Sequence, residues 1–453
     1  MMIPDTARTR DADLYAEELR NEYTQCIDEG KDMRALEPLF LAAAALKHGN
    51  VKSQIADALS HAAEDAPIAA DFPYCEPSDL AEILALRKPY RPLTGQTPDE
   101  HTLQRKIRGA WIGRICGCLL GKPLEGIHSE ELAVFLTKTG NNPLCRYPLR
   151  AELTQDLLCS VSFDLENKVY ADMLDSAPAD DDTNYTVLAQ CLIERHGRAF
   201  TSADVLDAWM RLQPVSAYFT AEQVAYRNRC AGLLPPYTAL YKNPFREWIG
   251  AQIRGDYFGY ICPGDPQQAA ELAWRDARIS HVKNGIYGEM LISAMLAAAA
   301  VTQDIHEILM QGLAQIPATS RLYARIMEII DGYAHAVSAE ACFARIHALY
   351  DEHTGYGWCH TISNAMIVTA ALLYGHGDFG KSICLAVQAA FDTDCNGATV
   401  GSILGMRNGI DGIGAQWYEP LHGKLTTQIL SIGTVEIESL VQTTLRHIHG
   451  GQV

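Results

Sequence analysis

The segment Asp392-Thr-Asp-Cys-Asn-Gly-Ala-Thr-Val-Gly-Ser-Ile-Leu-Gly405 decides the fold that this chain can adopt. It starts with two aspartates separated by one residue and continues as a helical pattern with glycines at positions 397, 401 and 405. Glycine weakens a helix, so its recurrence at every fourth position predicts a face without side chains that packs closely against another central helix. The segment therefore predicts a close-packed helix that begins at acidic residues.

A second segment has the same spacing of small residues and ends in an acidic loop. It reads Gly109-Ala-Trp-Ile-Gly-Arg-Ile-Cys-Gly-Cys-Leu-Leu-Gly-Lys-Pro-Leu-Glu-Gly126. The proline at 123 ends the helical pattern and leaves Glu125 in a loop beside Gly126. A loop glutamate is usually only solvated, but this one follows a close-packed helix, from which it can approach a pocket.

The rest of the pattern predicts an all-α fold. The run from Leu291 to Ala300 is apolar nearly all round, and Thr361 to Tyr374 gives a similar segment, so both predict buried helices. Period-two runs, which are typical of strands, are scarce.

The N-terminal part of the chain differs from the remainder. Residues from about 11 to 63 read as two or three amphipathic helices, and residues 88–98 form a proline-rich linker. We therefore expect a helical extension over residues 1–100 and a compact multi-helix catalytic domain over residues 101–453.

Composition excludes several classes of function. The chain has 453 residues, 48% of them hydrophobic, and a net charge of −18, which opposes binding to nucleic acid or to anionic lipid. Its 13 cysteines show no dense disulfide framework, its longest apolar run is too short to span a bilayer, and its N-terminus shows no signal sequence. We expect a soluble cytoplasmic protein and leave its oligomeric state open.

A second acidic cluster, Ala179-Asp-Asp-Asp-Thr183, also precedes a helical pattern. Taken alone, either cluster is explained by helix capping, because helix N-termini favour carboxylates. Taken together, two acidic clusters that open two apolar helices would place facing carboxylates inside the protein, where they repel unless a proton or a cation neutralises them. Hard divalent cations prefer such oxygen ligands, so the clusters predict a metal-dependent hydrolase.

Three ordered motifs resemble the signature blocks of the ADP-ribosylglycohydrolase family, which includes the dinitrogenase reductase-activating glycohydrolase and J1 crystallins. They are the segment from Gly113 to Gly126, the Asp181-Asp-Thr183 motif and the Asp392-Thr-Asp394 motif. The resemblance spans roughly residues 105 to 425 and leaves the N-terminal extension uncovered.

This resemblance implies an all-α domain with a binuclear magnesium or manganese centre that cleaves a glycosidic bond to ADP-ribose. Calcium is a further candidate ion, and the number of ions is left open. Glu125 matches the family's mobile acidic residue and is the expected acid or base. The expected metal ligands are Asp180, Asp181, Asp182, Thr183, Asp392, Asp394 and Cys395.

The chain departs from the family pattern at three positions. Asp180 and Cys395 replace threonines, and Cys118 replaces an aspartate. A thiol suits Mg²⁺ poorly because the ion prefers oxygen ligands, so these changes bear on the second metal position.

Polar residues elsewhere supply candidates for substrate binding. Arg246 and Arg254 suit a phosphate, although ion pairs that tie loops to the helical body explain them equally well. His360 lies where it could line the pocket, but a lone histidine is more often structural. The full set of expected substrate-binding residues is Gly126, Arg246, Arg254, His360, Asn364 and Asn396.

The sequence leaves several functions open. The first is hydrolysis of a ribosyl glycosidic bond in a small ADP-ribosyl compound, in a nucleoside or in an ADP-ribosylated protein. The second is a non-catalytic binding or structural protein on the same scaffold. The third is a metal-dependent phosphoesterase, since two-metal phosphoryl chemistry uses similar ligands.

Overall fold

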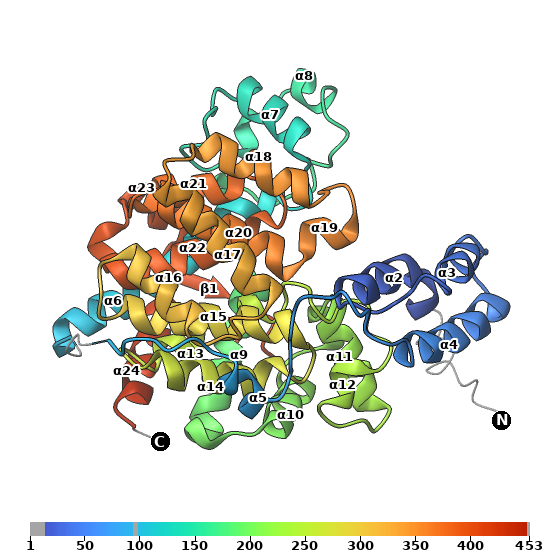
Figure 1. Ribbon diagram of the computed structural model, residues 1–453. Coiled ribbons are helices and arrows are strands. Elements are labelled where there is room, and N and C mark those ends of the chain that lie inside the picture. The colour runs from blue at the N-terminus through green and yellow to red at the C-terminus, as the bar shows by residue number, and fades with distance from the viewer. Residues whose placement is uncertain (1–13, 94–97, 451–453) are drawn as a thin grey trace, which may run out of the picture.

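The computed structural model describes residues 14–93 and 98–450 and confirms the all-α prediction (Figure 1). Its two named strands, β1 (Lys424–Thr426) and β2 (Thr434–Glu436), pair antiparallel with Leu425 opposite Val435. The residues before 14 that were expected to open the first helix, and residues 94–97 of the expected linker, lie outside the described residues.

The helices follow one another along the chain, and several of the connections are long, such as residues 159–180 between α8 and α9. Those of the N-terminal part are α2 (Leu19–Asp28), α3 (Glu37–Ala44), α4 (Asn50–Glu64) and α5 (Leu80–Ala85). The first half of the main body contains α6 (Glu100–Gly121), α7 (Ser129–Lys138), α8 (Gln155–Leu158), α9 (Asp181–His196), α10 (Ser202–Leu212), α11 (Thr220–Cys230), α12 (Tyr237–Leu240), α13 (Asp256–Tyr260) and α14 (Pro266–Ala277). The second half contains α15 (Lys283–Ala299), α16 (Ile305–Leu313), α17 (Arg321–Ala334), α18 (Ala339–Leu349), α19 (Gly355–Cys359), α20 (Thr361–Tyr374), α21 (Phe379–Gln388), α22 (Thr393–Asn408), α23 (Ala415–Tyr418) and α24 (Ile437–Ile448).

The centre of the fold is the contact between α6 and α22. A Cβ atom built on Gly117 would lie 1.9 Å from the carbonyl oxygen of Gly397, and other glycines meet in the same way. The two predicted glycine faces therefore pack against each other, with the helices antiparallel and their backbones in direct contact. The facing pairs are Gly109 with Gly405, Gly113 with Gly401, and Gly117 with Gly397.

This contact fixes how the functional ends of the two helices lie. At the last turn of α6, Gly121 packs on the backbone of Thr393 and Asp394, where an added Cβ would meet atoms at 2.3 Å. The Thr393 hydroxyl donates a hydrogen bond to the Gly121 carbonyl oxygen at 2.9 Å. Because α6 ends where α22 begins, the loop that carries Glu125 follows directly beside the acidic start of α22.

Two further helices enclose this pair. The segments predicted to be buried form α15 and α20, in which nearly every side chain is buried, as expected from their apolar composition. Both helices contact α22, so the acidic start of α22 lies inside the protein rather than at its surface.

The N-terminal helices form a lobe beside the main body (Figure 1). Helices α2 to α4 share a small core of their own around Leu19 and Phe40, whereas Ile83 of α5 belongs to the main core. Polar contacts join the lobe to the body: Gln25 donates to Glu247 at 2.7 Å, and Lys283 pairs with Glu29 at 2.9 Å. No helix within the described ranges has the length and hydropathy needed to cross a membrane.

We predict that Gly117→Ala destabilises the protein by about 1–3 kcal/mol, because the added methyl group would force the backbones of α6 and α22 apart. The matched control is Gly332→Ala in α17, where the new Cβ would meet its nearest neighbour at 3.8 Å. That variant should be neutral or stabilised by up to about 1 kcal/mol, since alanine favours a helix. Chemical denaturation measures both, and equal stability of the two variants would contradict the close contact.

Candidate active site

Carboxyl groups from three distant segments meet at the ends of α6, α9 and α22. Asp180 is the N-cap residue of α9, and its Oδ1 accepts a hydrogen bond from the Asp182 backbone N–H at 3.0 Å. Helix capping, the simpler explanation of this cluster, therefore holds for Asp180. The same helix start nevertheless faces Asp394 of α22, so capping and clustering occur together.

The closest ligand atoms form two groups that share one residue. Ligand atoms of Cys118, Asp180 and Asp182 lie within 4.8 Å of one another, and those of Asp182, Asp394 and Cys395 do the same. Asp182 thus stands at the centre of both groups. The expected ligands Asp180, Asp182, Asp394 and Cys395 are brought together, with Cys118 as an additional member.

Two carboxylate oxygens in this region lack a hydrogen-bond donor. Asp182 Oδ2 and Asp392 Oδ1 are buried and have no partner among the described residues. The other Asp392 oxygen accepts a long hydrogen bond from the Cys359 thiol at 3.6 Å. A buried carboxylate oxygen without a donor is costly, so these two oxygens are available for a cation.

Two basic side chains balance part of the negative charge. Lys122 forms an ion pair with Asp180, and Arg114 pairs with Asp182 at 3.0 Å and with Asp256 at 2.9 Å. Both cations lie in the segment from Gly109 to Gly126, and the sequence alone carries no signal for their pairing. The roles of Lys122 and Arg114 depend on which carboxylates the fold brings next to them.

The remaining carboxyl groups repel one another. Burial raises the pKa of Asp181, Asp182 and Asp392 well above the usual value, and neighbouring carboxylates act in the same direction. Burial also raises the pKa of Asp394. Burial would raise the pKa of Asp180 too, but the ion pair with Lys122 outweighs it and holds that pKa below its usual value. Neutralisation by protons or by a cation therefore stabilises the cluster.

Glu125 lies beside this cluster, and the charge of the cluster shifts its pKa. The Asp394 carboxylate raises the pKa of Glu125 to about 8, and burial and Asp180 act in the same direction. The backbone oxygen of Glu125 accepts a hydrogen bond from Lys168 at 3.2 Å. A carboxyl group with this pKa carries a proton at neutral pH, as a general acid must.

Asn364 of α20 organises the start of α22. Its side-chain oxygen accepts hydrogen bonds from the Asp392 backbone N–H at 3.3 Å and from the Asn396 amide at 2.7 Å. Its own amide donates to backbone oxygens of the segment before α20. Asn396 Oδ1 is buried with no donor in the described chain, so it can accept a hydrogen bond from a ligand.

Two other expected residues are engaged in hydrogen bonds with the backbone, and a third lies beside Glu125. The Thr183 hydroxyl donates to the Asp180 carbonyl oxygen at 3.2 Å. The His360 ring caps α20 by accepting from the Ile362 N–H at 3.1 Å, and burial lowers its pKa to about 4. Gly126 has a left-handed φ of 85° and is exposed beside Glu125.

The two arginines that were expected to bind substrate are held in buried ion pairs. Arg246 pairs with Glu22 and Glu29 of the N-terminal lobe, and Arg254 pairs with carboxylates inside the body. The structure does not bring either guanidinium group to the acidic cluster. Their alternative explanation, ion pairs that tie segments together, accounts for both.

A cavity of about 210 Å³ adjoins the site. Its walls include Gly126, Trp358 and Phe391, which are the sequence neighbours of Glu125, Cys359 and Asp392. Trp358 and Phe391 give this cavity aromatic surfaces on which a planar ring can stack. The backbone that carries Glu125 and Asp392 therefore contributes to the wall of this cavity.

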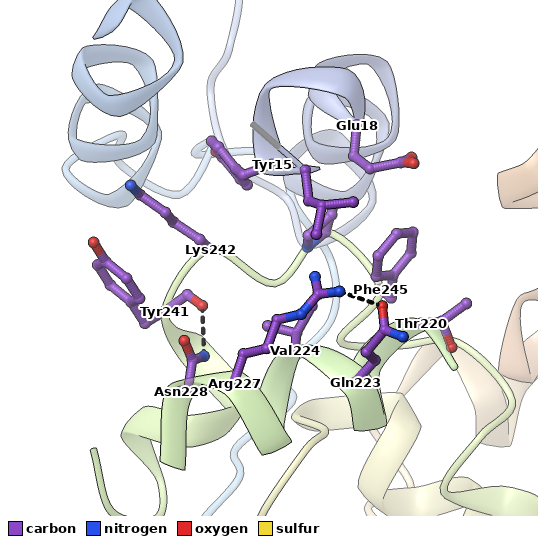
Figure 2. Close-up of a pocket in the computed structure, with 12 residues that line it drawn as sticks. Tyr15, Glu18, Thr220, Gln223, Val224, Arg227, Asn228, Tyr241, Lys242 and Phe245 are labelled. Atoms are coloured by element: carbon purple, nitrogen blue, oxygen red, sulfur yellow. Dashed lines mark hydrogen bonds between the residues drawn. The ribbon is translucent and has the colours of Figure 1, made fainter. Parts of the chain in front are cut away.

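A second cavity, of about 180 Å³, lies between the N-terminal lobe and α11 (Figure 2). Tyr15 and Glu18 of the lobe face Gln223 and Arg227 of α11 across it, and Arg227 donates to Gln223 at 2.8 Å. Its lining is mainly apolar and contains none of the clustered aspartates. The clustered aspartates do not line the first cavity either, but of these two cavities only the first is lined by direct sequence neighbours of Glu125 and Asp392.

Comparison with known proteins gives a family match and similar solved structures. The model of the ADP-ribosylglycohydrolase family matches residues 99–448. A solved structure described as an ADP-ribosylglycohydrolase-related protein complex is similar in fold, with a TM-score of 0.50 and 19% identity, covering 77% of this chain and 99% of that chain. A search of curated proteins found no match. The family resemblance drawn from the motifs is confirmed.

We predict that Asp394→Asn stabilises the metal-free protein, because it removes one of several repelling buried charges. The increase should be on the order of 1 kcal/mol, or about 2 °C in Tm for a chain of this size. The control is Asp175→Asn, which changes an exposed aspartate and should leave Tm unchanged. Thermal unfolding in EDTA measures both, and a lower Tm for Asp394→Asn would contradict net repulsion within the cluster.

Proposed function

Because the chain belongs to the ADP-ribosylglycohydrolase family, we propose that it is a metal-dependent hydrolase acting on the glycosidic bond of an ADP-ribosyl or related ribosyl compound. The observation that carries this proposal is the convergence of the starts of α9 and α22 beside Glu125, next to a cavity with aromatic walls. A purely structural protein has no need of a buried group of repelling carboxylates.

The residues of the cluster fit a hard divalent cation. Asp182 Oδ2 and Asp392 Oδ1 have no donor among the described residues, and Asp394 lies within ligand distance of Asp182. We propose Asp181, Asp182, Asp392 and Asp394 as the ligands of Mg²⁺ or Mn²⁺, since oxygen donors suit both ions. When bound, such an ion supplies a water molecule of lowered pKa and counters negative charge.

Asp180 and Arg114 have supporting roles in this proposal. Asp180 is paired with Lys122, so its charge is balanced without a metal ion. Arg114 holds the backbone oxygen of Asp182 at 2.8 Å and one of its carboxylate oxygens at 3.0 Å, which leaves the second carboxylate oxygen facing the cluster. Both interactions orient ligands and reduce the repulsion between them.

Glu125 is the residue that we assign to proton transfer. In hydrolysis, the bond from the ribose C1′ to the leaving atom breaks, water oxygen bonds to C1′, and the leaving atom needs a proton. Glu125 supplies that proton as a neutral carboxyl group, and as a carboxylate it can accept the proton that water loses. The proton that Glu125 takes from water restores its neutral form, so the cycle closes without a net change at this residue.

The cavity indicates the class of substrate. The free acceptor Asn396 Oδ1 suits a ribose hydroxyl, and Asn364 holds the Asn396 side chain in place. Trp358 and Phe391 offer stacking surfaces for a base or another planar ring. A small nucleotide-like or nucleoside-like compound therefore fits the site, and an ADP-ribosylated side chain that enters through the same cavity fits it as well.

The test is product analysis by mass spectrometry with ADP-ribosyl-arginine, O-acetyl-ADP-ribose and a nucleoside panel, in Mg²⁺, Mn²⁺ or EDTA. We expect free ADP-ribose or ribose only when metal is present. Glu125→Gln should lower kcat by about 10²- to 10⁴-fold, because proton transfer is lost. The control Glu340→Gln, on the exposed start of α18, should be unaffected.

Two outcomes would count against the proposal. Turnover that persists in EDTA would contradict metal dependence. Tight binding of metal without turnover of any of these compounds would favour the non-catalytic alternative, in which the same scaffold only binds its ligand.

The thiol of Cys395 gives a separate prediction about metal preference. Its sulfur lies within 4.8 Å of ligand oxygens of Asp182 and Asp394, where the family has a threonine hydroxyl. Sulfur accepts Mn²⁺ more readily than Mg²⁺. Cys395→Thr should therefore tighten Mg²⁺ binding relative to Mn²⁺ by roughly 10-fold, the size of effect typical of residues around a metal site.

Isothermal titration calorimetry with each metal measures this ratio. Cys75→Thr, which changes an exposed thiol outside the cluster, is the control. An unchanged ratio in Cys395→Thr would show that this sulfur does not face the metal.

A further inference from the structure

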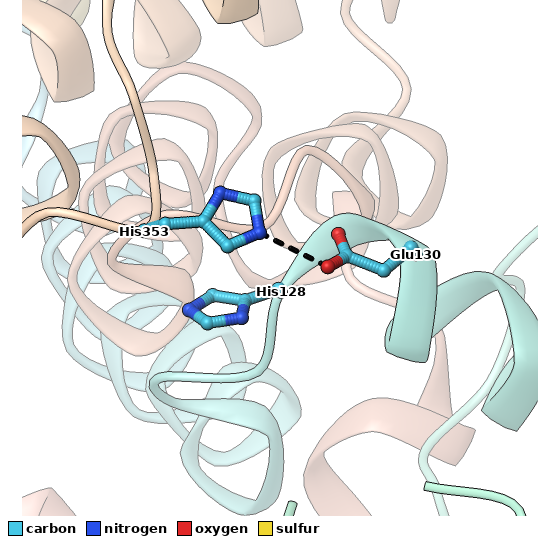
Figure 3. A group of neighbouring side chains, drawn as sticks. All are labelled: His128, Glu130 and His353. Atoms are coloured by element: carbon cyan, nitrogen blue, oxygen red, sulfur yellow. Dashed lines mark hydrogen bonds and ion pairs between the residues drawn. The ribbon is translucent and has the colours of Figure 1, made fainter. Parts of the chain in front are cut away.

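A second group of metal-binding side chains lies at the rim of the cavity, apart from the acidic cluster. It consists of His128, Glu130 and His353, whose ligand atoms lie within 4.8 Å of one another (Figure 3). His128 and Glu130 belong to the start of α7, just after the Glu125 loop, and His353 belongs to the loop before α19. The proposed hydrolase mechanism uses none of the three.

His353 is oriented like a histidine ligand. Its Nδ1 faces Asp351 Oδ1 at 3.1 Å, and its Nε2 faces Glu130 Oε1 at 3.0 Å. A neutral imidazole that donates from Nδ1 to Asp351 turns the lone pair of Nε2 toward the lone pairs of Glu130. This close approach of His353 Nε2 and Glu130 Oε1 is stable only with a proton or a cation between the two atoms. Metal-bound histidines usually donate their second N–H to a carboxylate in this way.

The separation of the two atoms suits a shared ion. Zinc lies about 2.0–2.1 Å from nitrogen and carboxylate ligands, so two ligands of a tetrahedral site lie about 3.3 Å apart. The 3.0 Å between His353 Nε2 and Glu130 Oε1 is close to that value. Only small side-chain movements are needed to admit the ion.

His128 supplies the third donor. Its ring centroid lies 4.2 Å from that of His353, with 42° between the ring planes (Figure 3). Within the described chain, no hydrogen bond engages either nitrogen of His128, so a small rotation can turn one of them to the ion. Two imidazoles and a carboxylate form a three-ligand set that leaves one position for water.

The backbone around the group is already fixed. Glu352 is buried and accepts hydrogen bonds from the Ser129 N–H at 3.0 Å and from the Ser129 hydroxyl at 2.5 Å. Ser129 lies between His128 and Glu130, and Glu352 precedes His353. The two segments are therefore joined at the point from which the three ligands project, so little conformational entropy is lost on binding.

We propose that His128, Glu130 and His353 bind a zinc-type transition-metal ion that bridges the start of α7 to the loop before α19. Imidazole nitrogen favours zinc over magnesium or calcium, which separates this group from the oxygen-rich cluster. Because His128 and His353 both line the cavity of about 210 Å³, the ion would hold two of its walls together. The inference does not depend on the hydrolase function.

The test is titration of the purified full chain with Zn²⁺ by isothermal calorimetry, in excess Mg²⁺ to occupy the acidic cluster. Wild type should bind one more equivalent of Zn²⁺ than His128→Gln or His353→Gln. Asp351→Asn should lower the affinity for this additional Zn²⁺ by about 10- to 100-fold, because Asp351 orients His353 without itself binding the ion. Any Zn²⁺ that binds to the acidic cluster is the same in every variant and cancels in the comparison.

His335→Gln, which changes an exposed histidine outside the group, is the control and should retain the equivalent. Hydrogen exchange supplies a second measurement, in which Zn²⁺ should slow exchange of the amides at 126–131 and 351–355 in wild type alone. Equal Zn²⁺ binding by wild type and both histidine variants would overturn the proposal and leave an ordinary surface ion pair between His353 and Glu130. Binding without slowed exchange would overturn the bridging role.

Discussion

The backbone contact between α6 and α22 is the constraint on which the rest of the structure depends. Glycines facing glycines allow the two helices to approach until the carbonyl oxygens of each occupy the space that side chains of the other would need, and any side chain at these positions would separate them. The antiparallel arrangement places the end of α6 at the start of α22. Glu125 and the aspartates of α22 are therefore neighbours because of this helix packing, which continues to Gly121 at the last turn of α6.

The second constraint is electrostatic. Burying several carboxylates in one place costs free energy, and the two nearby cations, Lys122 and Arg114, offset only part of it. Burial is the main cause of the raised pKa values of the clustered aspartates, and the remaining repulsion between carboxylates raises them further. A fold that retains such repulsion is consistent with a site that is completed by a divalent cation, and the same charge raises the pKa of Glu125 beside it.

The sequence predicted the periodicity and burial of the helices well, but it predicted less well which residues contact each other. It indicated both glycine faces, the buried helices α15 and α20, and the convergence of two acidic clusters, because each follows from local spacing and residue type. It did not indicate that the glycine faces pack on each other, that Lys122 and Arg114 pair with the aspartates, or that Arg246 is bound by the N-terminal lobe. Those pairings join residues far apart in the chain, and a single sequence carries no signal that matches one to the other.

The most direct measurement of the central claim is anomalous X-ray diffraction from crystals of the full chain grown with Mn²⁺. The account predicts an anomalous peak between the starts of α9 and α22, in contact with carboxylate oxygens of Asp182 and Asp394 and next to the Glu125 loop. Saturating Mn²⁺ that gives no peak there, or a peak only at carboxylates outside this cluster, would contradict the claim that the contact between α6 and α22 builds a metal centre.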